Sequence, residues 1–164
     1  MGNLVATFGA FGDLALESPS LLAPAFRLSV QGSLPTTVNA TATNDSATLT
    51  WVFARTEACP LRVALSSSVD ARPCAFVDGG ILDAAGGGPA NAQTKLGPWV
   101  TAGALARVTW LRELSARWAL VLEAQAGLVV PIVRQTFTFV PEITVYQAPA
   151  VTGLASIGAG VRFP

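Results

Sequence analysis

The most reactive side chains in this sequence belong to two cysteines, Cys59 and Cys74. If they are joined, they close a short loop, and in an oxidising compartment such a disulfide would contribute about 3 kcal/mol to stability. The sequence contains no histidine, and two cysteines alone are a poor ligand set for zinc, so we predict no metal site. Two free thiols in a cytosolic protein are the alternative.

Catalytic chemistry has little support in the sequence. The lack of histidine excludes serine–histidine hydrolysis, including the outer-membrane phospholipases and proteases that depend on it. Ser66, Ser67 and Ser68 have no partner base. The glycines at 86–88 lack the lysine of a phosphate-binding loop. We therefore expect no enzymatic activity and no cofactor.

The composition indicates either a densely packed soluble β protein or a barrel that faces lipid. Of the 164 residues, 51% are hydrophobic and only 12% are charged, and the mean hydropathy is +0.51. No apolar run reaches the ~18 residues of a membrane-spanning helix, because Glu123 and Gln125 interrupt the best candidate. The net charge is zero, which argues against nucleic acid as a partner.

Apolar and polar residues alternate with a period of two along most of the chain, as is typical of β-strands. This alternation predicts seven strands, at residues 4–17, 26–33, 48–56, 75–84, 99–111, 117–130 and 151–163. We expect Val100, Leu120 and Ile157 on the apolar face, and in 48–56 we place Leu49, Trp51 and Phe53 on the same face, opposite Thr48, Thr50 and Thr56. The predicted fold is all-β, an antiparallel up-and-down meander β-barrel that forms a single domain over residues 1–164.

The polar face of the predicted sheet carries threonine, serine and glycine together with a few charged residues. Such residues suit a narrow interior, where charges must pair with one another because an eight-stranded barrel has room only for side chains. We predict an interior charge network of Arg27, Arg107, Glu123 and Arg162. The chain has a single lysine, Lys95, which argues that the apolar face meets lipid and the polar face lies inside.

The predicted connections alternate between short turns at 17–22 and 112–115 and longer loops at 35–45, 85–96 and 134–149. Outer-membrane barrels place short turns in the periplasm and long loops outside. The link between Cys59 and Cys74 is an exception, because it is long but falls on the periplasmic side. Within the last loop, residues 136–139 and 143–146 either form an extra strand pair or lengthen the outer hairpin.

The number of strands leads to a further expectation. A bacterial single-chain barrel has an even number of strands, so we expect an eighth strand before residue 4, together with a signal peptide.

Three aromatic residues have positions that suit a membrane barrel. Trp110 and Trp118 flank one turn on the apolar face, and we predict that they form part of an aromatic girdle at a shared depth. Core packing is the alternative for each of them. Phe163 ends the last strand and resembles the C-terminal aromatic signal that the outer-membrane assembly machinery reads, although Pro164 follows it.

Three segments carry a resemblance to a group of proteins. They are Gly-Leu-Ala-Ser-Ile-Gly-Ala-Gly-Val-Arg-Phe at 153–163, Gly-Leu-Val-Val-Pro at 127–131 and Pro-Trp-Val-Thr-Ala-Gly-Ala at 98–104. In these segments the chain resembles uncharacterised outer-membrane barrels of myxobacteria, and more loosely it is similar to the small OmpA-type and OmpX-type eight-stranded barrels. The resemblance implies a location in the outer membrane of a Gram-negative bacterium and assigns no functional residue.

Three functions are compatible with these features. The first is an outer-membrane barrel of structural or surface-interaction type, in contact with lipid and with the barrel assembly machinery, whose loops meet an extracellular partner. The second is a soluble lipocalin-like barrel that binds a small apolar ligand with its apolar face turned inward. The third is a barrel enzyme that acts on membrane lipid with polar residues at the rim near Asp83 or Arg134. We expect the first.

Overall fold

The computed structural model describes residues 5–16, 20–39, 46–87, 94–115, 117–133, 136–139, 143–147 and 149–163. Its strands, in chain order, are β1 (Thr7–Ala15), β2 (Leu22–Ser33), β3 (Thr36–Asn39), β4 (Ser46–Leu61), β5 (Val63–Ala64), β6 (Val69–Gly87), β7 (Thr94–Ser115), β8 (Trp118–Pro131), β9 (Thr136–Phe139), β10 (Ile143–Gln147) and β11 (Thr152–Arg162). Among these residues, no helix is long and apolar enough to cross a membrane.

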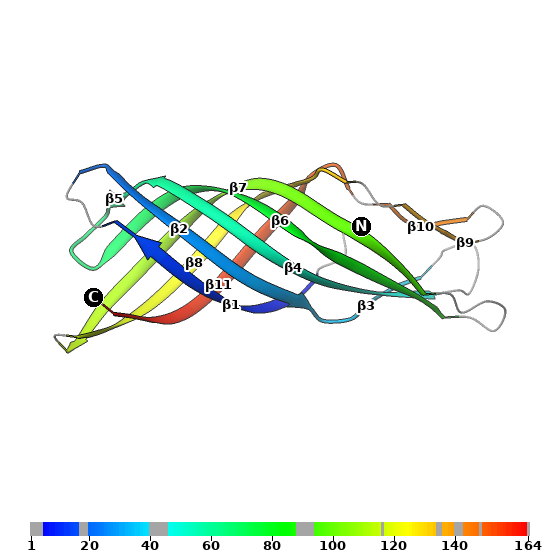
Figure 1. Ribbon diagram of the computed structural model, residues 1–164, viewed down its shortest axis with the longest axis horizontal. Coiled ribbons are helices and arrows are strands. Elements are labelled where there is room, and N and C mark those ends of the chain that lie inside the picture. The colour runs from blue at the N-terminus through cyan, green and yellow to red at the C-terminus, as the bar shows by residue number, and fades with distance from the viewer. Residues whose placement is uncertain are drawn as a thin grey trace.

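The main sheet has seven long strands in the order β1-β2-β4-β6-β7-β8-β11. Each long strand pairs with the next one in antiparallel orientation, and the sheet is curled into an open barrel (Figure 1). The predicted all-β, up-and-down architecture is therefore confirmed. The two short strands β3 and β5 extend this sheet beside β4 and β6.

Successive side chains of a strand point alternately into the barrel and out of it. For β8 the predicted faces are confirmed: Ala119, Glu123 and Gln125 are buried, while Leu122 and Leu128 are exposed. The predicted faces are also found along β2, where Arg27 and Ser29 are buried and Leu28 and Val30 are exposed.

The assignment of faces was wrong for β4. Leu49, Trp51 and Phe53 are buried inside the barrel, where they pack with Leu82 and Ala84 of β6, and the threonines between them lie on the outward side. The physical reason is that the interior contains an apolar cluster at this end of the sheet. Alternation alone identifies two faces of a strand and does not say which one is inside.

Several strands are longer than their hydrophobic patterns indicated. β7 continues to Ser115, so the turn to β8 lies at 116–117 instead of 112–115. β6 and β7 likewise take up much of the predicted loop 85–96. The link between β4 and β6 is only 62–68, where the N–H groups of Leu65 and Ser66 donate to the carbonyl oxygen of Val69. The link is therefore shorter than predicted, because the strands continue past both cysteines, but it is still longer than the turn between β7 and β8.

The segment between β8 and β11 forms its own antiparallel pair, β9 and β10, as a sheet separate from the barrel. Of the two alternatives for this segment, the structure supports a lengthened hairpin over two further barrel strands. β3, β9 and β10 lie together at one end of the molecule (Figure 1).

Inward glycines allow bulky side chains to fill the narrow interior. Phe76 of β6 pairs with Gly103 of β7, and Leu105 of β7 pairs with Gly127 of β8. A Cβ added at Gly103 would meet the carbonyl oxygen of Leu128 and come within 2.5 Å of the Phe76 ring. Close packing around the interior therefore depends on pairing a large residue with a residue that has no side chain.

We predict that Gly103→Ala destabilises the barrel by about 1–3 kcal/mol, the usual cost of overpacking. Gly79→Ala on β6 is the matched control, because its added Cβ meets nothing within 4 Å. Urea unfolding in detergent micelles, followed by tryptophan fluorescence, measures both variants. Equal unfolding midpoints for the two variants would contradict the packing argument.

Candidate functional site

The barrel interior contains a cluster of buried charges centred on Arg27 of β2. The guanidinium of Arg27 donates to Asp13 of β1, with Nε–Oδ1 at 2.8 Å and NH2–Oδ2 at 2.5 Å. It also donates to Glu123 of β8, with NH1–Oε1 and NH2–Oε2 both at 2.5 Å. The Arg27 side chain is 4% exposed, and its guanidinium carbon lies 3.9 Å from the centre of the Phe11 ring. One cation therefore binds two carboxylates on the inward face, one from the edge strand β1 and one from β8, near the other edge of the sheet.

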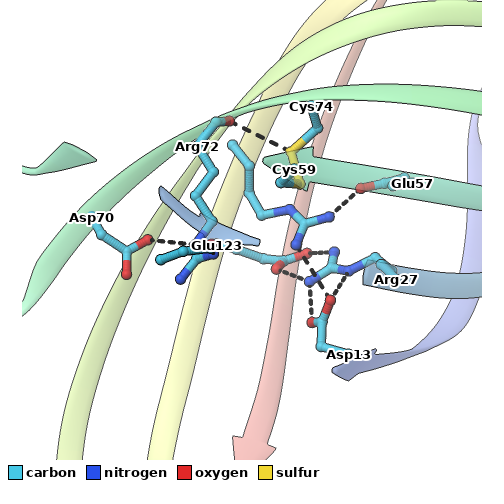
Figure 2. Close-up of a disulfide and its surroundings, with 10 residues drawn as sticks. Asp13, Arg27, Glu57, Cys59, Asp70, Arg72, Cys74 and Glu123 are labelled. Carbon is cyan, nitrogen blue, oxygen red and sulfur yellow. Dashed lines mark hydrogen bonds and ion pairs between the residues drawn. A yellow bond between two sulfur atoms is a disulfide. The ribbon is translucent and has the colours of Figure 1, made fainter. Parts of the chain in front are cut away.

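Arg107 of β7 extends this cluster. It donates to Asp13 at 3.3 Å and to the carboxylate of Glu57 on β4. Asp13, Arg27, Glu57, Arg107 and Glu123 thus form one connected set, which we call the interior cluster (Figure 2). It links β1, β2, β4, β7 and β8, which is most of the barrel wall.

A second buried pair lies further along the barrel. Arg55 of β4 donates to Asp78 of β6 at 2.7 and 2.9 Å. The Thr101 hydroxyl donates to the same carboxylate at 2.8 Å, and the guanidinium of Arg55 lies 4.1 Å from the centre of the Phe76 ring. Each of these charges is compensated within the interior, as burial in a medium of low dielectric requires.

The interior is filled by side chains. The apolar cluster of Leu49, Trp51, Phe53, Leu82 and Ala84 occupies one region. A second apolar cluster of Ala25, Cys59, Cys74, Phe76 and Leu105 packs beside the charges. The arrangement is that of a solid barrel held by ion pairs, and its carboxylates are occupied by arginines.

Three of the four predicted network residues meet in the interior cluster, because Arg27 contacts Glu123 directly and shares Asp13 with Arg107. For Arg162 the register gives only the backbone position: the partner of Glu123 on β11 is Gly158, and four further residues place the Arg162 backbone ~13 Å along the strand. The prediction omitted Glu57 and Arg55. Both occupy odd positions of β4, like Leu49 and Phe53, and were missed because the prediction turned these positions toward lipid.

The predicted disulfide between Cys59 and Cys74 is confirmed, with a Cα–Cα distance of 4.1 Å. The bond joins β4 to β6, and the two cysteines are only 1% and 4% exposed. Glu57 is close enough to both sulfurs to complete a three-atom group within 4.8 Å. This group is a poor metal site, because the sulfurs are bonded to each other and the carboxylate is paired with Arg107.

Trp110 and Trp118 lie on the outward side but at different levels. Trp110 pairs with Leu122, four residues along β8 from Trp118, which separates them by ~13 Å along the strand. The predicted shared depth was wrong because the turn lies at 116–117 and the hairpin is therefore centred later in the chain. Trp118 instead packs against Phe163, with ring centres 4.8 Å apart.

No protein-family model matches this chain, and neither the curated proteins nor the solved structures include a significant match. The resemblance to myxobacterial, OmpA-type and OmpX-type barrels stays a prediction.

We predict that Arg27→Met lowers the free energy of unfolding by about 3–5 kcal/mol, because it leaves two carboxylates without their shared cation. The control is Arg62→Met, which removes a half-buried arginine 3.1 Å from Asp70 and should cost at most about 1 kcal/mol. Urea midpoints in micelles provide the comparison. If Arg27→Met unfolds at the same urea concentration as Arg62→Met, the interior cluster does not stabilise the barrel.

We also predict that removing the disulfide, by Cys59→Ala with Cys74→Ala, costs about 3 kcal/mol through the entropy of the unfolded chain. The unchanged sequence, reduced while unfolded and then refolded under reducing conditions, should lose a similar amount. Equal losses in the two samples would show that the missing bond, and not the truncation of the cysteine side chains, causes the loss of stability. An unchanged unfolding midpoint in both samples would contradict the prediction.

Proposed function

We propose that this chain is an outer-membrane β-barrel of structural or surface-interaction type. The observation that carries the proposal is an uncharged apolar band on the outward face of the sheet. Lipid is the solvent that makes such a face stable, since a water-soluble barrel covers its outer surface with charges.

The height of the band suits a bilayer. On β6 the outward residues from Ala71 to Ile81 are uncharged, and at ~3.3 Å per residue and a tilt of ~40° these ten steps span ~25 Å, the usual height of the apolar band of a membrane barrel. On β7 the outward residues from Pro98 to Trp110 are also uncharged, and charge returns with the exposed Arg112.

The apolar side chains of this band are well exposed. Ile157 is 91% exposed and Leu14 is 77% exposed. Other large apolar residues share this outward face, including Phe8, Phe26, Leu28, Val30, Val77, Ile81, Val108, Leu122, Leu128 and Val161. In water, apolar patches of this extent on monomeric proteins are rare and mark contact surfaces.

The interior favours a structural role over a carrier role. A lipocalin-like carrier needs an apolar cavity, whereas this interior holds the interior cluster and packed aromatic residues. A lipid-modifying enzyme needs a group of polar residues at the rim. Asp83 pairs across the sheet with Thr50 and Leu96, which bring no second acid or base beside it, and Arg134 lies outside the described residues.

The two ends of the barrel differ in a way that suits a surface-interaction role. The ends of the strands where β1 passes to β2, β4 to β6 and β7 to β8 lie at one end of the barrel, and β3, β9 and β10 lie at the other. We assign the first end to the periplasm, as in other outer-membrane barrels. The second end, which carries β3, β9 and β10, then meets an extracellular partner, and Phe163 is the candidate signal for the barrel assembly machinery.

We predict that Ile157→Arg reduces stability in lipid bilayers by about 2–4 kcal/mol, the cost of a charge at the lipid-facing midplane. Ile157 pairs with Ala124 in the middle of β8. Leu114→Arg, at an exposed position in the last part of β7, is the control and should cost at most about 1 kcal/mol. Urea unfolding from phospholipid vesicles measures the difference.

Cell fractionation and heat-dependent gel mobility test the location directly. We expect the unchanged chain in the outer-membrane fraction, with a mobility that shifts on boiling. A chain that stays in the soluble fraction, and in which Ile157→Arg is as stable as Leu114→Arg, would overturn the proposal.

A further inference from the structure

The arginines of the described chain fall into two groups. Most of them have a partner within the chain: Arg27, Arg55, Arg62, Arg72 and Arg107 form ion pairs with carboxylates, and Arg162 also makes an interaction. Arg112 and Arg117 are exposed, and no carboxylate of the described residues pairs with either guanidinium. Both belong to the β7–β8 hairpin, at the end where it turns. Two positive charges are therefore left uncompensated by the chain at one place on the surface.

Arg112 lies on the outward face, at the edge of the apolar band. Successive positions of β7 alternate between the two faces, and Arg107 is buried while Leu114 is 65% exposed. Trp110 is the outward residue before Arg112, and Trp118 follows beyond the turn, where it is 51% exposed. The arginine therefore lies between two levels of aromatic side chains.

Arg117 lies in the turn of the same hairpin. Its backbone N–H donates to the hydroxyl of Ser115 at 3.3 Å, which fixes the turn. Three residues separate Arg117 from Leu120, the ladder partner of Arg112, so the two arginine backbones are about 10 Å apart along the hairpin. Two long side chains can approach one anion from both ends of this distance.

The acid nearest to these arginines in the sequence does not compensate them. Glu113 is in the opposite phase of β7 and pairs with the buried Ala119, so it lies on the inward side. The neighbouring connection from β4 to β6 is different, because Arg62 there has Asp70 at 3.1 Å. The β7–β8 hairpin thus has an excess of positive charge that its neighbour lacks.

The level of Arg112 makes a lipid phosphate the fitting anion. Tryptophan side chains concentrate where the hydrocarbon meets the headgroups, and arginines at this level extend their side chains toward the headgroups. A guanidinium binds phosphate through two parallel N–H···O bonds. A periplasmic protein would meet the rim of the barrel, whereas Arg112 lies on its side, between Trp110 and Trp118.

We propose that Arg112 and Arg117 bind the phosphate of an anionic phospholipid in the leaflet around this end of the barrel. The inference rests on the proposed function, which places the outward face in lipid. An anionic headgroup such as phosphatidylglycerol fits the two uncompensated charges. A zwitterionic headgroup such as phosphatidylcholine fits them less well, because the guanidinium groups repel its ammonium group.

Native mass spectrometry of the full chain in detergent micelles tests the proposal. Phosphatidylglycerol and phosphatidylcholine with the same acyl chains are added in equal amounts, and the lipid retained by the protein is measured. We expect the unchanged chain to retain at least tenfold more phosphatidylglycerol than phosphatidylcholine. The double variant of Arg112→Gln with Arg117→Gln should lose at least tenfold of the phosphatidylglycerol and keep its phosphatidylcholine.

Two controls show whether the effect belongs to this site. Arg62→Gln removes an arginine at the same end of the barrel that already has a carboxylate partner, and it should change the retained lipid by less than twofold. Arg112→Gln alone, which removes the same amount of charge, should lose at least threefold of the phosphatidylglycerol. Heat-dependent gel mobility checks that each variant is folded, which we expect because neither Arg112 nor Arg117 pairs with a carboxylate of the described chain.

Three results would overturn the inference. They are equal retention of the two lipids by the unchanged chain; a loss in Arg62→Gln as large as that in Arg112→Gln, which indicates a general effect of charge; and displacement of the lipid by an equal concentration of inorganic phosphate, which indicates a site for free phosphate. A chain that fractionates with the outer membrane but shows no lipid preference overturns this inference alone, whereas a soluble chain overturns the proposed function.

Discussion

The charge on Arg27 is the constraint on which the rest of the barrel depends. A guanidinium inside protein is unfavourable unless carboxylates surround it, and those carboxylates come from Asp13 and Glu123, on strands β1 and β8. Satisfying this one cation therefore requires a sheet of seven strands to curl until β8 faces β2 across the interior. The pairing of Arg107 with Asp13 and Glu57 imposes the same curvature from other strands.

The packing of the interior follows from that curvature. A narrow barrel leaves no room for large residues on every strand at one level, so bulky residues face glycines across the ladder, as with Phe76 and Gly103. Between Ala71 and Ile81 on β6 and between Pro98 and Trp110 on β7 the outward residues are uncharged, and the charged residues of these stretches, such as Asp78 and Arg107, point inside. The apolar outward band and the ion pairs of the interior are thus two results of one alternation along the strands.

The sequence allowed the fold class to be predicted because β7, β8 and β11 alternate cleanly between small polar and apolar residues. The faces of β4 were misassigned because Trp51 and Phe53 are apolar yet lie inside, and alternation does not tell which face of a strand is buried. The turn near Trp110 was placed too early because polar residues such as Arg112 mark the end of the apolar band, whereas the strand continues beyond it. The partners of Arg27 could not be found by spacing alone, since Glu123 is distant in the chain and meets it only across the interior.

The burial of the Cys59–Cys74 bond has a consequence for the order in which the molecule is assembled. Both sulfurs are enclosed by Ala25, Phe76 and Leu105, so an oxidising enzyme cannot reach them once the interior is packed. Enzyme-catalysed oxidation therefore has to precede the packing of Ala25 from β2 and Leu105 from β7 over the sulfurs. Once formed, the bond fixes β4 against β6, so the covalent link sets the register of the middle of the sheet.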